Sequence, residues 1–271
     1  MSLDNGEQKI FIWIDFSPET EVVILHGVQV ARILNKDVCL IYHPADKKVL
    51  VEEAMSSLQR LTEPIKHIIG EGRVHFLVAV PKLESILTDM AEEYDALLLV
   101  AHKKNSKELL RQLPYSGFPF LFVSAKQNMD LSYRKIAIPV GYMKKCKDLA
   151  LWSSYFARHN GAKVTLLKTI EMFGEDNRMV MSHIFSIERL FKNFQFLYEI
   201  VECHTPTWKI QKKALEHALG FQQGLLIISF TYSSSFIDRL FKINDAFVID
   251  HSEDLSVMCI NSQRDLYTFC S

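Results

Sequence analysis

The sequence lacks the features that mark several classes of protein. Lysine and arginine number 31 and aspartate and glutamate 32, so the formal net charge is only −1. This balance gives no electrostatic argument for a nucleic acid or an anionic membrane as partner. No apolar run approaches the ~18 residues that span a bilayer. The first nine residues, "MSLDNGEQK", contain no apolar core and do not resemble a secretory signal.

Cysteine patterns and catalytic motifs are also missing. The five cysteines form no Cys-x-x-Cys pair, and an odd count fits a reduced, cytoplasmic protein better than a disulfide scaffold. There is no P-loop, no nucleophile elbow, no Ser-His-Asp spacing and no metalloprotease helix. Nothing in the sequence therefore argues for catalysis, and we expect a cytoplasmic protein that is not an enzyme.

What the sequence does contain is an internal repeat. Apolar runs of the first half return in the second half in the same order and at nearly constant spacing. The matching pairs are "KIFIWIDF" at 9–16 with "KIAIPVGY" at 135–142, "VCLIYHP" at 38–44 with "VTLLKTI" at 164–170, "ALLLVAH" at 96–102 with "GLLIISF" at 224–230, and "FLFVSA" at 120–125 with "VMCINS" at 257–262. The repeat predicts two copies of one domain, residues 7–126 and 132–263.

Each copy alternates short apolar runs with segments of helical period, such as the one in which Leu149, Trp152 and Phe156 recur on one face of a predicted helix. Continuous runs of four to eight apolar residues are typical of parallel strands buried on both faces. Ser17 followed by Pro18 indicates a helix N-cap with proline at the first helical position. Asn35 and its counterpart Gly161 fall where a helix C-cap needs a positive φ. Strand–helix alternation of this kind predicts an α/β fold with a doubly wound parallel sheet, formed twice.

The opening of each copy resembles the universal stress protein family. "IWIDFSPET", a predicted helix and "NKDVCLIYHP" are similar to that family's first β-α-β unit, and Asp15–Val38 has the same spacing as Gly141–Val164. The resemblance implies two tandem five-stranded parallel-sheet domains of the adenine nucleotide alpha hydrolase-like type, with strand order 3-2-1-4-5. It also implies that the two copies pair through their last strands as a pseudo-dimer.

Some members of that family bind ATP through three features, and the resemblance carries these onto the first copy. An aspartate ends the first strand, a small apolar residue ends the second, and a glycine-containing loop holds the phosphates after the fourth. Glycines let backbone N–H groups approach the phosphate. The loop here reads "AHKKNSKELLRQLPYSGF" at 101–118 and has no Gly-Ser after it at the expected spacing. The candidate nucleotide contacts are Asp15, His43, Ala101, His102 and Lys104.

The second copy departs further from the pattern. Gly141 replaces the aspartate, Thr169 stands at the base-packing position, and the loop at 229–247 contains no glycine. The resemblance therefore implies that ATP binding in the usual manner is lost in the second copy.

Three interpretations of the first copy's strand ends stay open. Asp15 is either a ligand contact or a polar strand end that caps the following helix. Asp15, His43 and His102 end three neighbouring strands of the expected sheet, where doubly wound folds place ligands, so they could form a metal or acid–base site. Lys103, Lys104 and Lys107 could contact a phosphate, or they could belong to a solvated loop.

We expect a tandem universal stress protein that works as a stress-linked binding or interaction module, without turnover and without a resident cofactor. The alternative is a protein that binds ATP or AMP at one site in the first copy. A third hypothesis is a small hydrolase or metal site at Asp15, His43 and His102. The expected partner is a second copy of the chain, forming a homodimer, or another protein, with no nucleic acid and no membrane.

Overall fold

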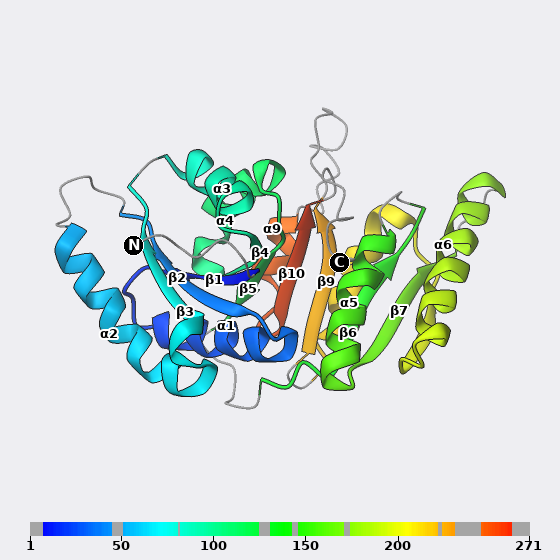
Figure 1. Ribbon diagram of the computed structural model, residues 1–271. Coiled ribbons are helices and arrows are strands. Elements are labelled where there is room, and N and C mark those ends of the chain that lie inside the picture. Colours follow the sequence, from blue (N-terminus) through cyan, green and yellow to red (C-terminus); the bar gives the residue numbers. More distant parts are fainter. Residues whose placement is uncertain are drawn as a thin grey trace. The chain divides into compact units, whose positions relative to one another are not determined.

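A computed structural model describes residues 8–44, 51–80, 82–124, 131–142, 146–170, 174–221, 224–230 and 245–261. The chain divides into two compact units, residues 1–125 and 126–271. Each unit alternates parallel strands with helices (Figure 1). The predicted α/β class with a parallel sheet is therefore confirmed.

Unit 1 contains a parallel sheet in the order β3-β2-β1-β4-β5. Figure 1 shows α1 and α2 on one side of these strands and α3 and α4 on the other. Its elements are β1 Lys9–Ile14, α1 Thr20–Leu34, β2 Asp37–Tyr42, α2 Val51–Ile69, the 3₁₀ turn η1 Glu71–Arg73, β3 Val74–Val78, α3 Leu83–Glu92, β4 Ala96–His102, η2 Lys103–Asn105, α4 Ser106–Gln112, η3 Leu113–Tyr115 and β5 Phe120–Val123.

Unit 2 repeats this order with its own strands, β8-β7-β6-β9-β10, all parallel. Its elements are β6 Lys135–Val140, α5 Cys146–Asn160, β7 Lys163–Thr169, α6 Gly174–Asn193, β8 Tyr198–Cys203, η4 Thr207–Lys209, α7 Ile210–Ala218, β9 Gly224–Phe230, α9 Asp245–Asp250 and β10 Ser256–Asn261. The expected pairing of the two copies through their last strands stays a prediction.

The central strands form the core of each unit. All six residues of β1 are buried, as are five of the six in β6. Trp152 and Phe156 of α5 are completely buried, as their helical spacing predicts. Because the first strands are buried on both faces, their polar residues are found at the strand ends, and those ends position the candidate site.

Two expectations about helix ends have different outcomes. Asn35 ends α1 with φ 50° and Gly161 follows α5 with φ 61°, so both predicted left-handed residues are confirmed. The predicted N-cap at Ser17 is wrong, because α1 begins at Thr20 after a turn that contains Ser17 and Pro18. The Ser17 carbonyl instead accepts the Thr20 amide at 3.0 Å.

No helix among the described residues is long and apolar enough to cross a membrane.

Candidate functional site

Asp15 follows β1 at the carboxyl end of the strand and anchors the turn that leads into α1. Its Oδ1 accepts a hydrogen bond from the Ser17 amide at 3.0 Å and another from the Thr20 hydroxyl at 3.4 Å. An aspartate that accepts the amide two residues on stabilises a turn without further help. Asp15 therefore stabilises the turn that precedes α1 and contacts the first residue of that helix, Thr20, through its hydroxyl, while the helix itself has no side-chain cap.

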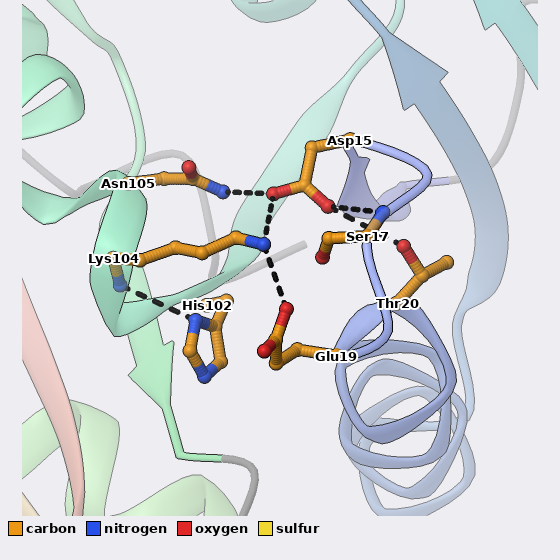
Figure 2. Close-up of polar contacts among 7 residues, drawn as sticks. All are labelled: Asp15, Ser17, Glu19, Thr20, His102, Lys104 and Asn105. Carbon is orange, nitrogen blue, oxygen red and sulfur yellow. Dashed lines mark hydrogen bonds and ion pairs between the residues drawn. The ribbon is translucent and has the colours of Figure 1, made fainter.

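The second oxygen of Asp15 faces the segment that follows β4 (Figure 2). Oδ2 accepts from the Asn105 side-chain amide at 3.1 Å and lies 3.1 Å from the Lys104 ammonium. The same ammonium donates to Glu19 Oε2 at 2.8 Å. Side chains from the β4–α4 segment thus tie it to the β1–α1 turn.

His102 supports this arrangement from the end of β4. Its Nδ1 accepts the Lys104 backbone amide at 3.3 Å, which fixes the start of η2 (Figure 2). Burial lowers the pKa of His102, which favours the uncharged ring. We therefore assign His102 a role in shaping the turn that presents Lys104.

The carboxylates of the cluster stay ionised. Burial of Asp15 opposes ionisation, but hydrogen bonds from Ser17, Asn105 and Lys104 outweigh it and hold the pKa of that carboxyl well below its usual range. The hydrogen bond from Lys104, aided by Ser17, lowers the pKa of Glu19 to about 2. Burial also opposes a charged Lys104, yet its bonds to Glu19 and Asp15 raise the pKa of the ammonium. Two carboxylates and one ammonium leave this cluster with one net negative charge.

The other predicted site residues lie around this cluster without joining it. His43 follows β2, where its Nδ1 is 2.8 Å from the Ala79 carbonyl oxygen and its ring centroid is 6.1 Å from that of Trp13. Ala101 lies inside β4 and is completely buried, so its side chain cannot contact a ligand at the strand end.

The structure does not bring Asp15, His43 and His102 together as a metal set. Among the described residues, no three histidine, cysteine, aspartate or glutamate side chains are arranged to hold a metal ion. His43 is engaged with Ala79 beside β3, whereas Asp15 is engaged with residues that follow β4. In the described residues these three side chains are therefore not gathered into a metal site.

Sequence reasoning missed Glu19 and Asn105 as members of the cluster. Glu19 lies only four residues after Asp15. This short spacing could have predicted a second carboxylate beside Asp15. Asn105 lies 90 residues from Asp15, and no local pattern connects the two. Lys104 was identified only through its place in the loop, as a phosphate contact.

In unit 2 the equivalent strand end is filled by Thr207. A Cβ on Gly141 would lie 2.5 Å from Thr207 Cγ2 and 2.6 Å from its Oγ1, so no side chain fits there. Thr207 Oγ1 accepts the Tyr142 amide at 3.3 Å and lies 3.5 Å from Thr169 Oγ1. Thr207 therefore occupies the space that an aspartate equivalent to Asp15 would need at this strand end.

Hydrogen bonds also hold the Gly141 backbone in place. The carbonyl of Gly141 lies 2.9 Å from His183 Nδ1 and accepts from the Cys146 thiol at 3.4 Å. Most of the glycine-free loop of this copy, residues 231–244, lies outside the described residues.

No family model and no curated protein matches the sequence. Solved structures do match the fold. A universal stress protein from Archaeoglobus fulgidus DSM 4304 has a TM-score of 0.65 at 11% identity, covering 93% of this chain and 96% of that one. A functionally unknown protein from Pseudomonas aeruginosa PAO1 has a TM-score of 0.60 at 13% identity, with 95% and 93% covered.

A third match is a protein assigned to the universal stress proteins, from Pseudomonas aeruginosa UCBPP-PA14. It has a TM-score of 0.59 at 13% identity, with 95% of this chain and 94% of that chain covered. At the level of fold, the resemblance inferred from "IWIDFSPET" is confirmed over nearly the whole chain.

Proposed function

We propose that this chain, which has the universal stress protein fold, is a tandem binding or interaction module linked to stress responses. In this proposal it acts in the cytoplasm without turnover, without a resident cofactor and without ATP binding in the family's usual manner. The cytoplasmic assignment is supported by the four described cysteines, all of which are free thiols.

One observation carries the proposal. Both carboxylate oxygens of Asp15 are taken by groups of the chain itself, namely the Ser17 amide, Thr20, Asn105 and Lys104. A ligand hydroxyl or base could reach Asp15 only by displacing one of these donors. Asp15 is thereby accounted for as a structural group that joins two loops.

The charges around Asp15 also argue against a bound phosphate group. The ammonium of Lys104, which pairs with Asp15, is already neutralised by two carboxylates. The cluster of Asp15, Glu19 and Lys104 carries one net negative charge, which disfavours a polyphosphate placed directly against it. In unit 2, Thr207 occupies the corresponding space.

The test is the melting temperature of the full chain with and without millimolar Mg-ATP or AMP. We expect no shift with either nucleotide, and the same result for Asp15→Ala measured against its own ligand-free value. A ligand at about 100 times its dissociation constant would add about 2.7 kcal/mol to the free energy of unfolding. For a protein of this size, that corresponds to several degrees.

A shift that disappears in Asp15→Ala would contradict the proposal and favour the alternative function, a nucleotide binder with one site in unit 1. A specific observation keeps this alternative open: Lys104 and Asn105 bring an ammonium and an amide donor to the end of β4, beside Asp15. In that case Lys104→Ala should also abolish the shift, because Lys104 would be the phosphate contact.

A further inference from the structure

Lys104 joins two loops at the carboxyl end of the unit 1 strands. Its ammonium lies between two carboxylates from the β1–α1 turn, 3.1 Å from Asp15 Oδ2 and 2.8 Å from Glu19 Oε2 (Figure 2). Asn105, the next residue, adds a neutral hydrogen bond to Asp15. These side-chain contacts span 85 and 90 residues of sequence, so they fasten together two segments that are remote along the chain.

We propose that Lys104 is a displaceable ionic latch that holds the β4–α4 segment against the β1–α1 turn and controls access to Asp15. The inference does not rest on the proposed function, because it concerns only the contacts that hold two loops together at this edge. A ligand or partner that binds at Asp15 must first displace Lys104.

The ion pairs of the latch are open to solvent. The side chains of Lys104, Asp15 and Glu19 are 37%, 25% and 31% exposed. Partly exposed pairs of this kind are screened by salt, since the Debye length falls to ~3 Å at 1 M ionic strength. The contact is therefore reversible and depends on the charge of residue 104.

The turn that carries Lys104 has no buried residue, whereas α4 after it is anchored by buried Ser106, Leu109 and Leu110. Residues 103–105 form a single 3₁₀ turn, and α4 has only seven residues, Ser106–Gln112. Elements this short depend on tertiary contacts for their order. Loss of the Lys104 contacts should therefore loosen residues 103–110 locally and leave the buried strands unaffected.

Unit 2 provides a contrast within the same molecule. Its strand end is closed by Thr207, a neutral side chain that is only 2% exposed and packs directly on Gly141. Packing and neutral hydrogen bonds do not respond to salt in the way that ion pairs do. The two strand ends are thus held by different means, ion pairs in unit 1 and packing with neutral hydrogen bonds at Thr207 in unit 2.

Hydrogen exchange of the full chain, without nucleotide, tests the latch. At 50 mM salt, Lys104→Gln should exchange amides 103–110 about two- to fivefold faster than wild type, the range expected for losing weak ion pairs. Wild type at 1 M salt should show the same local increase, whereas Lys104→Arg, which keeps the charge, should resemble wild type at low salt. The matched control is Lys213→Gln, which removes the exposed pair to Glu216 in α7.

The latch is supported if exchange rises only in residues 103–110 and in the facing turn, 15–20, with no change there in Lys213→Gln. It is overturned if Lys104→Gln exchanges like wild type, or if exchange rises equally throughout unit 1. The two exchange experiments, Lys104→Gln at low salt and wild type at 1 M salt, contain no nucleotide. A negative result in them would therefore leave the melting-temperature test of the proposed function unaffected.

Discussion

At the scale of single residues, the two copies show how one position can be used in opposite ways. In unit 1 the strand end has a carboxylate whose oxygens are shared among four donors. In unit 2 the equivalent residue is Gly141, because Thr207 occupies the space that a side chain would need. Gly141 and Thr207 therefore depend on each other, since the absence of a side chain at one leaves room for the side chain of the other.

This pairing predicts a steric coupling. Gly141→Ala would place its Cβ 2.5 Å from Thr207 Cγ2, so we expect it to lower the free energy of unfolding by about 1–3 kcal/mol. In a Thr207→Ala background the loss should be clearly smaller, since two of the three clashing atoms are gone. Urea unfolding of both single variants and the double variant measures the coupling.

The control for this cycle is Gly72→Ala, because no atom lies within 4 Å of the position its Cβ would take. Equal losses for Gly141→Ala in both backgrounds would show that Thr207 is not the cause.

At the scale of elements, helix ends show where local sequence is sufficient. The first helix of each copy ends on a left-handed residue, Asn35 in one and Gly161 in the other. Asn35 is held additionally, because its side-chain oxygen accepts from Arg73 at 3.2 Å. No neighbouring atom lies within 4 Å of the position a Cβ on Gly161 would take, so any cost of substitution there comes from the backbone alone.

Gly161→Ala should therefore lower the free energy of unfolding by about 1 kcal/mol, because a non-glycine residue is strained at φ 61°. Gly161→Asn should cost less, since asparagine tolerates this conformation and Asn35 already adopts it in the first copy. Equilibrium unfolding in urea measures both variants. Equal stability of wild type, the alanine variant and the asparagine variant would contradict this account.

At the scale of the whole molecule, the two units share one strand order but expose different surfaces. The described part of unit 2 includes large apolar side chains in contact with solvent, among them Phe185 on α6 at 69% exposure and Leu197 before β8 at 66%. Large exposed apolar groups often mark surfaces for a partner. They support, without identifying the partner, the proposal that the chain associates with a second copy or another protein.

We expect the purified chain to self-associate and Phe185→Ser to shift the equilibrium toward single chains, because burial of this side chain would stabilise the complex. Light scattering across a range of concentrations measures the mass. Met55→Ser, an exposed apolar residue of α2, serves as the control on unit 1. A single-chain mass for wild type at every concentration would contradict self-association.

The sequence by itself determined the features that depend on period and on local backbone preference. Apolar runs located the first, second, fourth and fifth strands of each copy but not β3 or β8. Helical spacing placed Trp152 and Phe156 in the core, and Asn35 and Gly161 indicated left-handed helix ends. Even the wrong N-cap at Ser17 placed α1 within a few residues of its true start. These features are readable because strand and helix each repeat with a fixed period, and because glycine and asparagine adopt a positive φ more readily than other residues.

Only the tertiary structure decided what the strand ends do. Asp15 meets Asn105 across 90 residues of sequence, Gly141 is closed by Thr207, and His43 turns to Ala79 instead of joining a metal set. The physical reason is that such contacts depend on which loops the strand order brings together and on the direction of individual side chains. No periodic pattern in the chain specifies the loop neighbours or the side-chain directions, so only the folded structure determines the contacts of these strand ends.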